Sequence, residues 1–308
     1  MSDPLAGPTG PGHDMATGGL APGGLAGYPP EDHFLRDLDV TVELRADGTA
    51  RGTIPVGPDT LVAGGWPRAG IVGVLVDSVA GAAAVMTARP DRVATADMTL
   101  HLFRPLTGPE VAVEASVMRR GRTTVVIEAT VTDGAVGGPL GWATLTFALL
   151  AARAHQTPPG DAFRLTETVR TAFGGRQSGR SVLERIGWGP DGRQADMSEP
   201  AGDLVDLVHL EVDEYVRNTF GAVQGGIVAL LADEAARRAA PGTVVADLHL
   251  AFLAPCKVGP IVGRARLLEP PGVGAGAVLV ELRDAGAGGR VTTVADAGVV
   301  VPAATVGR

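Results

Sequence analysis

The longest apolar run of the chain predicts one buried helix, and the segments around it alternate as strands do. Residues 69–88 are almost all apolar or small, and Pro90 ends the predicted helix because proline cannot continue helical backbone. An alternating segment at 38–45 and the turn at 46–48 predict a hairpin that ends near Val56. Four strand-like segments follow the helix, at 93–103, 110–118, 123–132 and 140–150.

The second half of the chain repeats this order. Residues 69–77 and 225–233 align at an offset of 156, with five of nine residues identical, and the offset falls to 150 after the helices. The pattern predicts strands within 193–212, a helix at 225–238, and strands near 244–253, 260–268, 277–283 and 291–300. This is an internal duplication of an α+β unit.

Each copy places one carboxylate, Asp77 or Asp233, two turns inside its apolar helix. A lone acid in such a helix is costly unless it has a partner or a chemical role. Because both copies keep the acid at the same register, we interpret the two aspartates as site residues. A purely structural hydrogen bond to a loop or to a facing helix is the alternative.

Composition sets the domain limits. Residues 1–33 are rich in Gly and Pro and predict a disordered tail, and 153–180 form a polar linker with a short helix near 166–173. The N-terminal domain is then 34–152 and the C-terminal domain 181–303.

The net charge of -8 argues against nucleic-acid binding. The single cysteine, Cys256, excludes an intramolecular disulfide and favours a reducing, cytoplasmic location. The first residues lack the pattern of a signal peptide, and Asp77 with several glycines interrupts the most apolar stretch, so we predict no membrane span.

One long apolar helix followed by an antiparallel sheet resembles the hotdog fold. The helix motif is similar to that of acyl-CoA thioesterases of the phenylacetyl-CoA and hydroxybenzoyl-CoA (PaaI-like) type, in which His-Gly-Gly begins the helix and an acid lies nine residues after the His. Arg68 to Asp77 and Gln224 to Asp233 keep that spacing. The resemblance implies two tandem hotdog domains of α+β class, each an antiparallel sheet wrapped around one central helix.

Neither copy keeps the histidine, which is replaced by Arg68 and Gln224. The following glycine is Ala69 in the first copy and Gly225 in the second. A polar residue that the family often carries six positions before the histidine is Val62 in the first copy and Asn218 in the second. The two half-sites have therefore diverged, and the second keeps more of the motif.

Thioester hydrolysis needs a base or nucleophile, and donors for the oxyanion. Asp77 lies about 12 Å along its own helix from Ala69, so it cannot reach a carbonyl held there. An antiparallel neighbouring helix would bring Asp77 to Gly225, and Asp233 to Ala69. We therefore predict a composite catalytic site of Asp77, Gly225, Gln224 and Asn218, and a weakened one around Asp233.

Several of the residues that are candidates for substrate binding also have a purely structural interpretation. Gly70 and Gly226 either admit the thioester or allow close packing, and Asn218 is either a site amide or a turn residue. Arg68 and Ala69 flank the weakened site. Arg122 lies in a basic turn that either meets CoA phosphates or is solvated.

The sequence thus predicts a cytoplasmic acyl-CoA thioesterase that hydrolyses a thioester to free acid and CoA. We expect no metal or other cofactor, no nucleic-acid or membrane partner, and by analogy a homodimer of double hotdogs. A non-catalytic acyl-CoA or lipid-binding double hotdog is the alternative from another class. A hotdog dehydratase or hydratase is disfavoured because no histidine occupies either helix motif.

Overall fold

The computed structural model describes residues 28–134, 138–151, 169–173, 181–188, 204–272 and 274–303. The first half contains α1 (Phe34–Asp37), β1 (Thr41–Leu44), β2 (Ala50–Pro55), α2 (Ala69–Ala88), β3 (Arg92–Leu102), β4 (Glu110–Arg120), β5 (Thr124–Thr132) and β6 (Pro139–Leu150). The rest comprises β7 (Val169–Ala172), α3 (Val182–Arg185), β8 (Val205–Leu210), α4 (Gly225–Ala239), β9 (Val244–Phe252), β10 (Ile261–Glu269), β11 (Gly276–Asp284) and β12 (Arg290–Val300).

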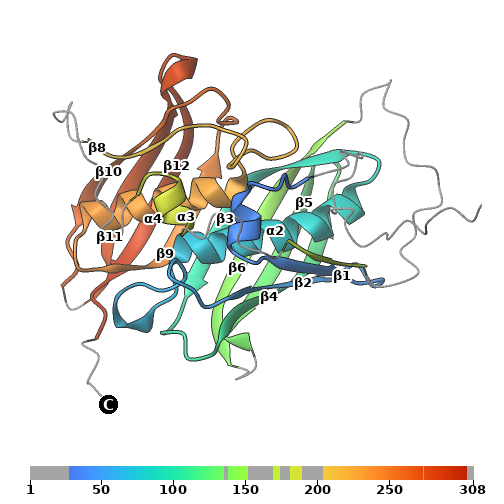
Figure 1. Ribbon diagram of the computed structural model, residues 1–308, viewed down its shortest axis with the longest axis horizontal. Coiled ribbons are helices and arrows are strands. Elements are labelled where there is room, and N and C mark those ends of the chain that lie inside the picture. The colour runs from blue at the N-terminus through green and yellow to red at the C-terminus, as the bar shows by residue number, and fades with distance from the viewer. Residues whose placement is uncertain are drawn as a thin grey trace, which may run out of the picture.

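The described strands form one antiparallel sheet in the order β7-β1-β2-β4-β5-β6-β3-β9-β12-β11-β10-β8. Each half contributes one end of this sheet, and β3 pairs with β9 at the centre, where Thr99 lies opposite His249. Figure 1 shows the long helices α2 and α4 crossing the middle of the molecule in front of the sheet. This is the predicted α+β arrangement of two tandem hotdog units.

The helices α2 and α4 pack against each other in antiparallel directions. A Cβ on Gly70 would lie 2.5 Å from Leu230 Cα, and a Cβ on Gly226 would overlap Val74 Cα. Glycine at these two positions therefore lets the helix backbones approach closely. Of the two roles considered for Gly70 and Gly226, the packing role is the one that the structure shows.

The 20-residue helix α2 forms the centre of the hydrophobic core. Among the described residues, it is the one helix that is long and apolar enough to cross a membrane. Most of this helix is buried inside the protein. Its buried residues include Ile71, Val74 and Leu75, which face the sheet and α4. The one acid among the buried residues of α2 is Asp77, and its carboxylate lies against the start of α4 in the other half.

The limits of α2, α4 and the strands β3 to β6 and β9 to β12 agree with the predicted elements to within a few residues. The predicted short helix at 166–173 is wrong, because residues 169–172 form strand β7. Its backbone pairs with β1, with Thr171 opposite Val42, so β7 satisfies hydrogen-bonding groups of an edge strand. The predicted strand residues 193–203 lie outside the described residues.

Two short helices, α1 and α3, were not predicted, and they share the same local pattern. His33 and Ser181 each cap the helix that follows, and Asp39 and Gly187 each have a positive φ just after it. The helix α1 also shortens the predicted tail of 1–33. Residues 28–33 are part of the folded structure, since His33 is buried, while residues 1–27 lie outside the described ranges.

Candidate active site

Asp77 of the first half points at the start of α4 in the second half. Its Oδ2 accepts a hydrogen bond of 2.7 Å from Gln224 Nε2, and its Oδ1 accepts one of 2.8 Å from Thr95 Oγ1 on β3. The antiparallel helices thus bring together Asp77, Gln224 and Gly225, as the spacing argument predicted. We call this group of residues, with Thr95 and Gly226, the Asp77 site.

Gln224 is the N-cap of α4, and its amide group spans the space between the helix start and Asp77. While Nε2 donates to Asp77, Oε1 accepts from the backbone N–H groups of Gly226, at 2.6 Å, and Ile227, at 3.3 Å. A side-chain oxygen that satisfies these first N–H groups is what a helix N-terminus requires. The same N–H groups are the donors that an oxyanion would use.

Glycine at position 225 allows this approach. A Cβ there would lie 2.9 Å from both Oδ1 and Oδ2 of Asp77, so any larger residue would push the carboxylate away from the helix start. The aligned residue in the first half is Ala69, which carries that Cβ. The two half-sites therefore differ sterically at the point where the acid meets the helix.

Burial raises the pKa of Asp77 to about 6, and hydrogen bonds from Thr95 and from the Gly226 amide oppose this rise. The Gly226 N–H thus acts on the Asp77 carboxylate as well as on Gln224 Oε1. A carboxyl group with a pKa near 6 is ionised at neutral pH and remains basic enough to take a proton. Thr95 aligns with Val245 in the second half, so only the first copy supplies this hydroxyl.

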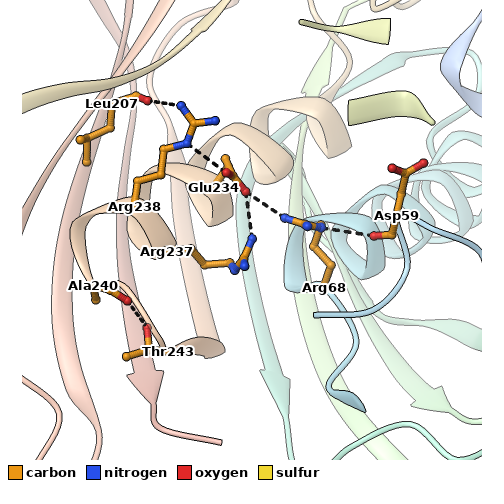
Figure 2. Close-up of polar contacts among 8 residues, drawn as sticks. All are labelled: Asp59, Arg68, Leu207, Glu234, Arg237, Arg238, Ala240 and Thr243. Atoms are coloured by element: carbon orange, nitrogen blue, oxygen red, sulfur yellow. Dashed lines mark hydrogen bonds and ion pairs between the residues drawn. The ribbon is translucent and has the colours of Figure 1, made fainter. Parts of the chain in front are cut away.

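The residue next to the aligned Asp233, Glu234, is surrounded by arginines, as Figure 2 shows. Arg68, Arg237 and Arg238 all converge on the neighbouring Glu234, at 2.8, 3.0 and 3.0 Å respectively. Arg68 also donates from Nε to the backbone oxygen of Asp59. We call these four residues, Arg68, Glu234, Arg237 and Arg238, the arginine cluster. Arg68 precedes α2, at the position where the helix motif of the first half begins. The cluster therefore takes up the position that corresponds to Gln224 in the Asp77 site.

Asp233 itself is fully buried, whereas Asp77 is 7% exposed. Neither oxygen of Asp233 has a hydrogen-bond partner of ordinary geometry within the described chain. Burial raises its pKa, while the charges of Arg68 and Arg237 and the Gly70 amide act in the opposite direction. Asp233 therefore lacks side-chain partners equivalent to Thr95 and Gln224, which orient Asp77.

The structure shows different surroundings for the other predicted site residues. Asn218 Oδ1 accepts from the backbone of Phe220, at 2.9 Å, and of Ala222, at 3.2 Å, so its amide oxygen serves the loop as a turn residue. Arg122 is exposed at the β4–β5 turn. Arg68 has its guanidinium in the arginine cluster and Ala69 is buried, so neither presents a free group to a substrate.

The sequence reasoning missed Thr95, which donates a hydrogen bond to Asp77, and Tyr28, on whose phenol the Asp77 charge acts. Thr95 could have been found by comparing the repeats, because the change to Val245 removes a polar group at one position of an otherwise similar strand. Tyr28 precedes the repeat, and no spacing rule connects it with Asp77. The Asp77 charge contributes to raising the pKa of its phenol, after burial, which has the larger effect.

Among the residues that the structure describes, no three His, Cys, Asp or Glu side chains form a group that could hold a metal ion. Cys256 is buried and donates to Thr292 Oγ1 at 3.0 Å, and burial raises the pKa of its thiol to about 11. A thiol with so high a pKa is a poor nucleophile.

Comparison with known proteins identifies one superfamily in the first half of the chain. Residues 69–138, which include α2 and Asp77, match the model of the thioesterase superfamily. No curated protein sequence matches the chain at a significant level.

Two solved structures resemble the whole arrangement. One is an acyl-ACP thioesterase from Bacteroides thetaiotaomicron, with a TM-score of 0.54 and 11% identity, over 82% of this chain and 98% of that one. The other is a 12:0-ACP thioesterase from Umbellularia californica, also with a TM-score of 0.54 and 11% identity, over 82% of this chain and 94% of that one. At these identities the likeness concerns the fold. The chain is thus a double-hotdog protein whose residues 69–138 match the thioesterase superfamily.

Proposed function

We propose that the protein is an acyl thioesterase that hydrolyses an acyl-CoA at the Asp77 site. The observation that carries this proposal is the contact of the Asp77 carboxylate with Gln224 and Thr95 at the start of α4. A buried acid with a raised pKa, placed beside the N-terminal amides of a helix, has the two components that thioester hydrolysis needs. The thioesterase superfamily match over residues 69–138 supports the same reaction class.

Asp77 acts in its ionised form, either by taking a proton from water or by attacking the carbonyl carbon. In the first case water adds to the carbonyl carbon, the C–S bond breaks, and the proton taken up by Asp77 passes to the leaving thiolate. In the second case the C–S bond breaks to leave an anhydride on Asp77, the thiolate takes up a proton from water, and a water molecule then hydrolyses the anhydride. Both routes end in the free acid and the thiol. Thr95 and Gln224 hold the carboxylate in place during these steps. The Gly226 and Ile227 amides become available to the oxyanion when Gln224 Oε1 moves aside.

One active site per chain follows from the asymmetry of the halves. Asp233 has no hydroxyl partner, Ala69 carries the Cβ that Gly225 lacks, and the arginine cluster fills the space near the start of α2. We infer that the Asp233 half-site is structural. A cytoplasmic location and a homodimer of double hotdogs remain predictions from the sequence.

The test is the release of free thiol from a panel of aryl and aliphatic acyl-CoAs and one acyl-ACP. The ACP substrate is included because both solved relatives act on that carrier by name. Asp77→Asn should reduce turnover at least about a hundredfold, whereas Asp233→Asn should leave it within about twofold. Equal activity of wild type and Asp77→Asn would refute the site.

A non-catalytic acyl-CoA-binding protein is the second candidate. The observation that favours it is the occupation of the Gly226 and Ile227 amides by Gln224 Oε1, which blocks the donors expected to stabilise an oxyanion. In that case the protein would bind acyl-CoA tightly, and the bound thioester would remain intact after prolonged incubation. Mass spectrometry of the bound ligand separates the two functions.

A further inference from the structure

The backbone that precedes α4 folds into a tight hairpin, residues 216–224, which ends at Gln224. The Gln224 N–H donates to Val216 O at 2.9 Å, so its backbone is fixed against the opposite arm of the hairpin. From this position its Nε2 donates to Asp77 Oδ2 at 2.7 Å. We call residues 216–224 the Gln224 hairpin. A shift of this hairpin would move the amide that contacts the Asp77 carboxylate.

The segment that precedes the first hotdog unit covers the outer side of the Gln224 hairpin. Arg217 bridges Val223 as an antiparallel pair whose hydrogen bonds are made by the flanking residues, so the Arg217 carbonyl points away from the opposite arm. His33 Nε2 lies 3.1 Å from this carbonyl oxygen, and Phe34 N donates to Tyr215 O at 3.3 Å. The hairpin arm is therefore held by its own pairing on one side and by this segment on the other.

The hydrogen bonds of the buried His33 ring define its tautomer. The backbone N–H of Leu35 donates to Nδ1 at 3.3 Å, so Nδ1 carries no proton. The ring proton is therefore on Nε2, which donates it to the Arg217 carbonyl. Burial lowers the pKa of His33 to about 4, although the bond to Arg217 acts in the opposite direction, so the ring is neutral at pH 7. One nitrogen caps α1 and the other holds the Gln224 hairpin.

The helix α1, which carries this imidazole at its N-cap, is itself fixed to the second half. Tyr215 Oη donates to Asp37 Oδ2 at 2.7 Å, and both side chains are buried. Arg185 lies over the Tyr215 ring at 4.7 Å and forms an ion pair with Asp32 at 2.8 Å. These contacts surround the bond from His33 and give the imidazole a rigid support.

The other short helix, α3, shows what a cap needs. Its N-cap, Ser181, accepts from Glu184 N at 3.0 Å, and the link to the opposite half is made by Val182 N, which donates to Asp59 Oδ2 at 2.9 Å. A serine is therefore sufficient to cap such a helix. What His33 adds is a second nitrogen that reaches the backbone of the Gln224 hairpin.

We propose that His33 is a positioning residue of the Asp77 site. Its Nε2–H holds the Arg217 carbonyl, and the Gln224 hairpin thereby keeps its amide against the Asp77 carboxylate. This assignment rests on the proposed thioesterase function. It also makes the segment 28–38 part of the working site, although this segment lies outside both copies of the helix motif.

The experiment separates the two nitrogens of His33. In His33→Asn the side-chain oxygen replaces Nδ1 and still caps α1, but the side chain is too short to reach Arg217. In His33→Gln the amide nitrogen replaces Nε2 and still donates to Arg217. His33→Asn should lower kcat by about tenfold to a hundredfold with KM within about threefold, because the carboxylate loses its alignment. His33→Gln should keep kcat within about threefold of the wild type.

Stability does not separate these two variants, since both lose the packing of the imidazole ring and both should have a lower Tm. Ser181→Ala is the matched control for the loss of a short-helix cap, and it should lower Tm while kcat stays near the wild-type value. If the wild type is active and the two His33 variants have equal kcat, the positioning role is refuted and the proposed function stands.

A second readout does not depend on turnover. The Gln224 amide donates to the ionised carboxylate, so its displacement in His33→Asn should raise the pKa of Asp77, followed by NMR on protein with isotopically labelled aspartate. The titration should keep its wild-type midpoint in His33→Gln and in Ser181→Ala. An unshifted titration in His33→Asn overturns the positioning role whatever the activity.

The two readouts distinguish failure of the positioning role from failure of the proposed function. If the wild type hydrolyses no thioester and the titration shifts in His33→Asn alone, the proposed function fails and the positioning of Gln224 by His33 stands. If His33→Asn does not fold, His33→Gln is the test by itself, because it must keep the wild-type titration of Asp77. A shifted titration in His33→Gln would then overturn the role of the Nε2 donor.

Discussion

At the residue scale, one of the differences between the two half-sites is a single methyl group. Gly225 lets the Asp77 carboxylate approach the start of α4, and Ala69 carries the additional Cβ at the aligned position. This difference could be predicted from the sequence, because the spacing from Gly225 to Asp77 follows from two antiparallel helices. Comparing the repeats distinguishes Thr95 from Val245, but the hydrogen bond from Thr95 to Asp77 could not be predicted, since it depends on how β3 packs beside α2.

Gly225→Ala should lower thioesterase activity by about tenfold to a hundredfold with little change in Tm. The new Cβ would lie 2.9 Å from both carboxylate oxygens, and the carboxylate can move away at the expense of its alignment. The matched control is Gly226→Ala, whose Cβ would overlap the Val74 backbone, so it should cost about 1–3 kcal/mol of folding free energy. Thermal melts and thiol release on both variants check the pair, and full activity in Gly225→Ala would contradict the site geometry.

The activity should depend on the ionisation of Asp77. Because burial raises its pKa to about 6, kcat/KM should rise as the pH increases through about 6 and then level off. The folded pKa is above the unfolded value of 3.8, so ionisation disfavours the folded state. The penalty develops between the two pKa values, so Asp77→Asn should gain stability relative to the wild type between pH 3.5 and pH 8, by up to about 3 kcal/mol. Urea unfolding at the two pH values measures the difference.

At the scale of elements, the long helices and the strands were predictable and the short helices were not. Residues 69–88 carry a long apolar pattern, whereas α1 and α3 have four residues each and no period to detect. Their caps, His33 and Ser181, lie 148 residues apart, so the repeat offset of 156 does not align them. The predicted helix at 166–173 failed because the β1 edge, which is remote in sequence, determines the structure there.

The arginine cluster connects α4 to the start of α2 and should contribute to stability rather than to catalysis. Glu234→Gln would leave three arginines without their shared counter-charge, and we expect a loss of about 3 kcal/mol or more. Arg68→Met leaves Glu234 paired with Arg237 and Arg238, and it should cost less. Urea unfolding measures both losses, while kcat of the folded variants should stay near the wild-type value. A larger loss in Arg68→Met would contradict this account.

At the scale of the whole molecule, the two halves share one sheet across the β3–β9 pairing. Histidine–aspartate pairs bridge this junction in both directions. His249 lies 2.8 Å from Asp97 of the first half, and His101 lies 2.6 Å from Asp247 of the second. The sequence predicted these residues as ordinary strand positions, since only the pairing register shows that they meet.

The junction should be sensitive to pH through His249. Burial lowers the pKa of His249, and the carboxylates of Asp97 and Asp296 more than offset this, so the pKa lies above its ordinary value. The stabilisation is therefore fully present at low pH and is lost as the pH rises through the folded pKa. His249→Gln should lower the unfolding free energy by about 0.2–1 kcal/mol at pH 5.5 and by less at pH 9. In Asp97→Asn this pH dependence should be weaker, and an equal effect of His249→Gln at both pH values would contradict the assignment.

The union of both copies in one polypeptide has a consequence for how such a protein evolves. In an assembly of two identical subunits, every codon change appears in both sites, so a change that ruins one ruins the other. Here Thr95 and Val245, or Gly225 and Ala69, are separate positions that can change independently. One half-site can therefore hold a cluster of arginines beside its acid while the other combines an acid with a hydroxyl and a glycine.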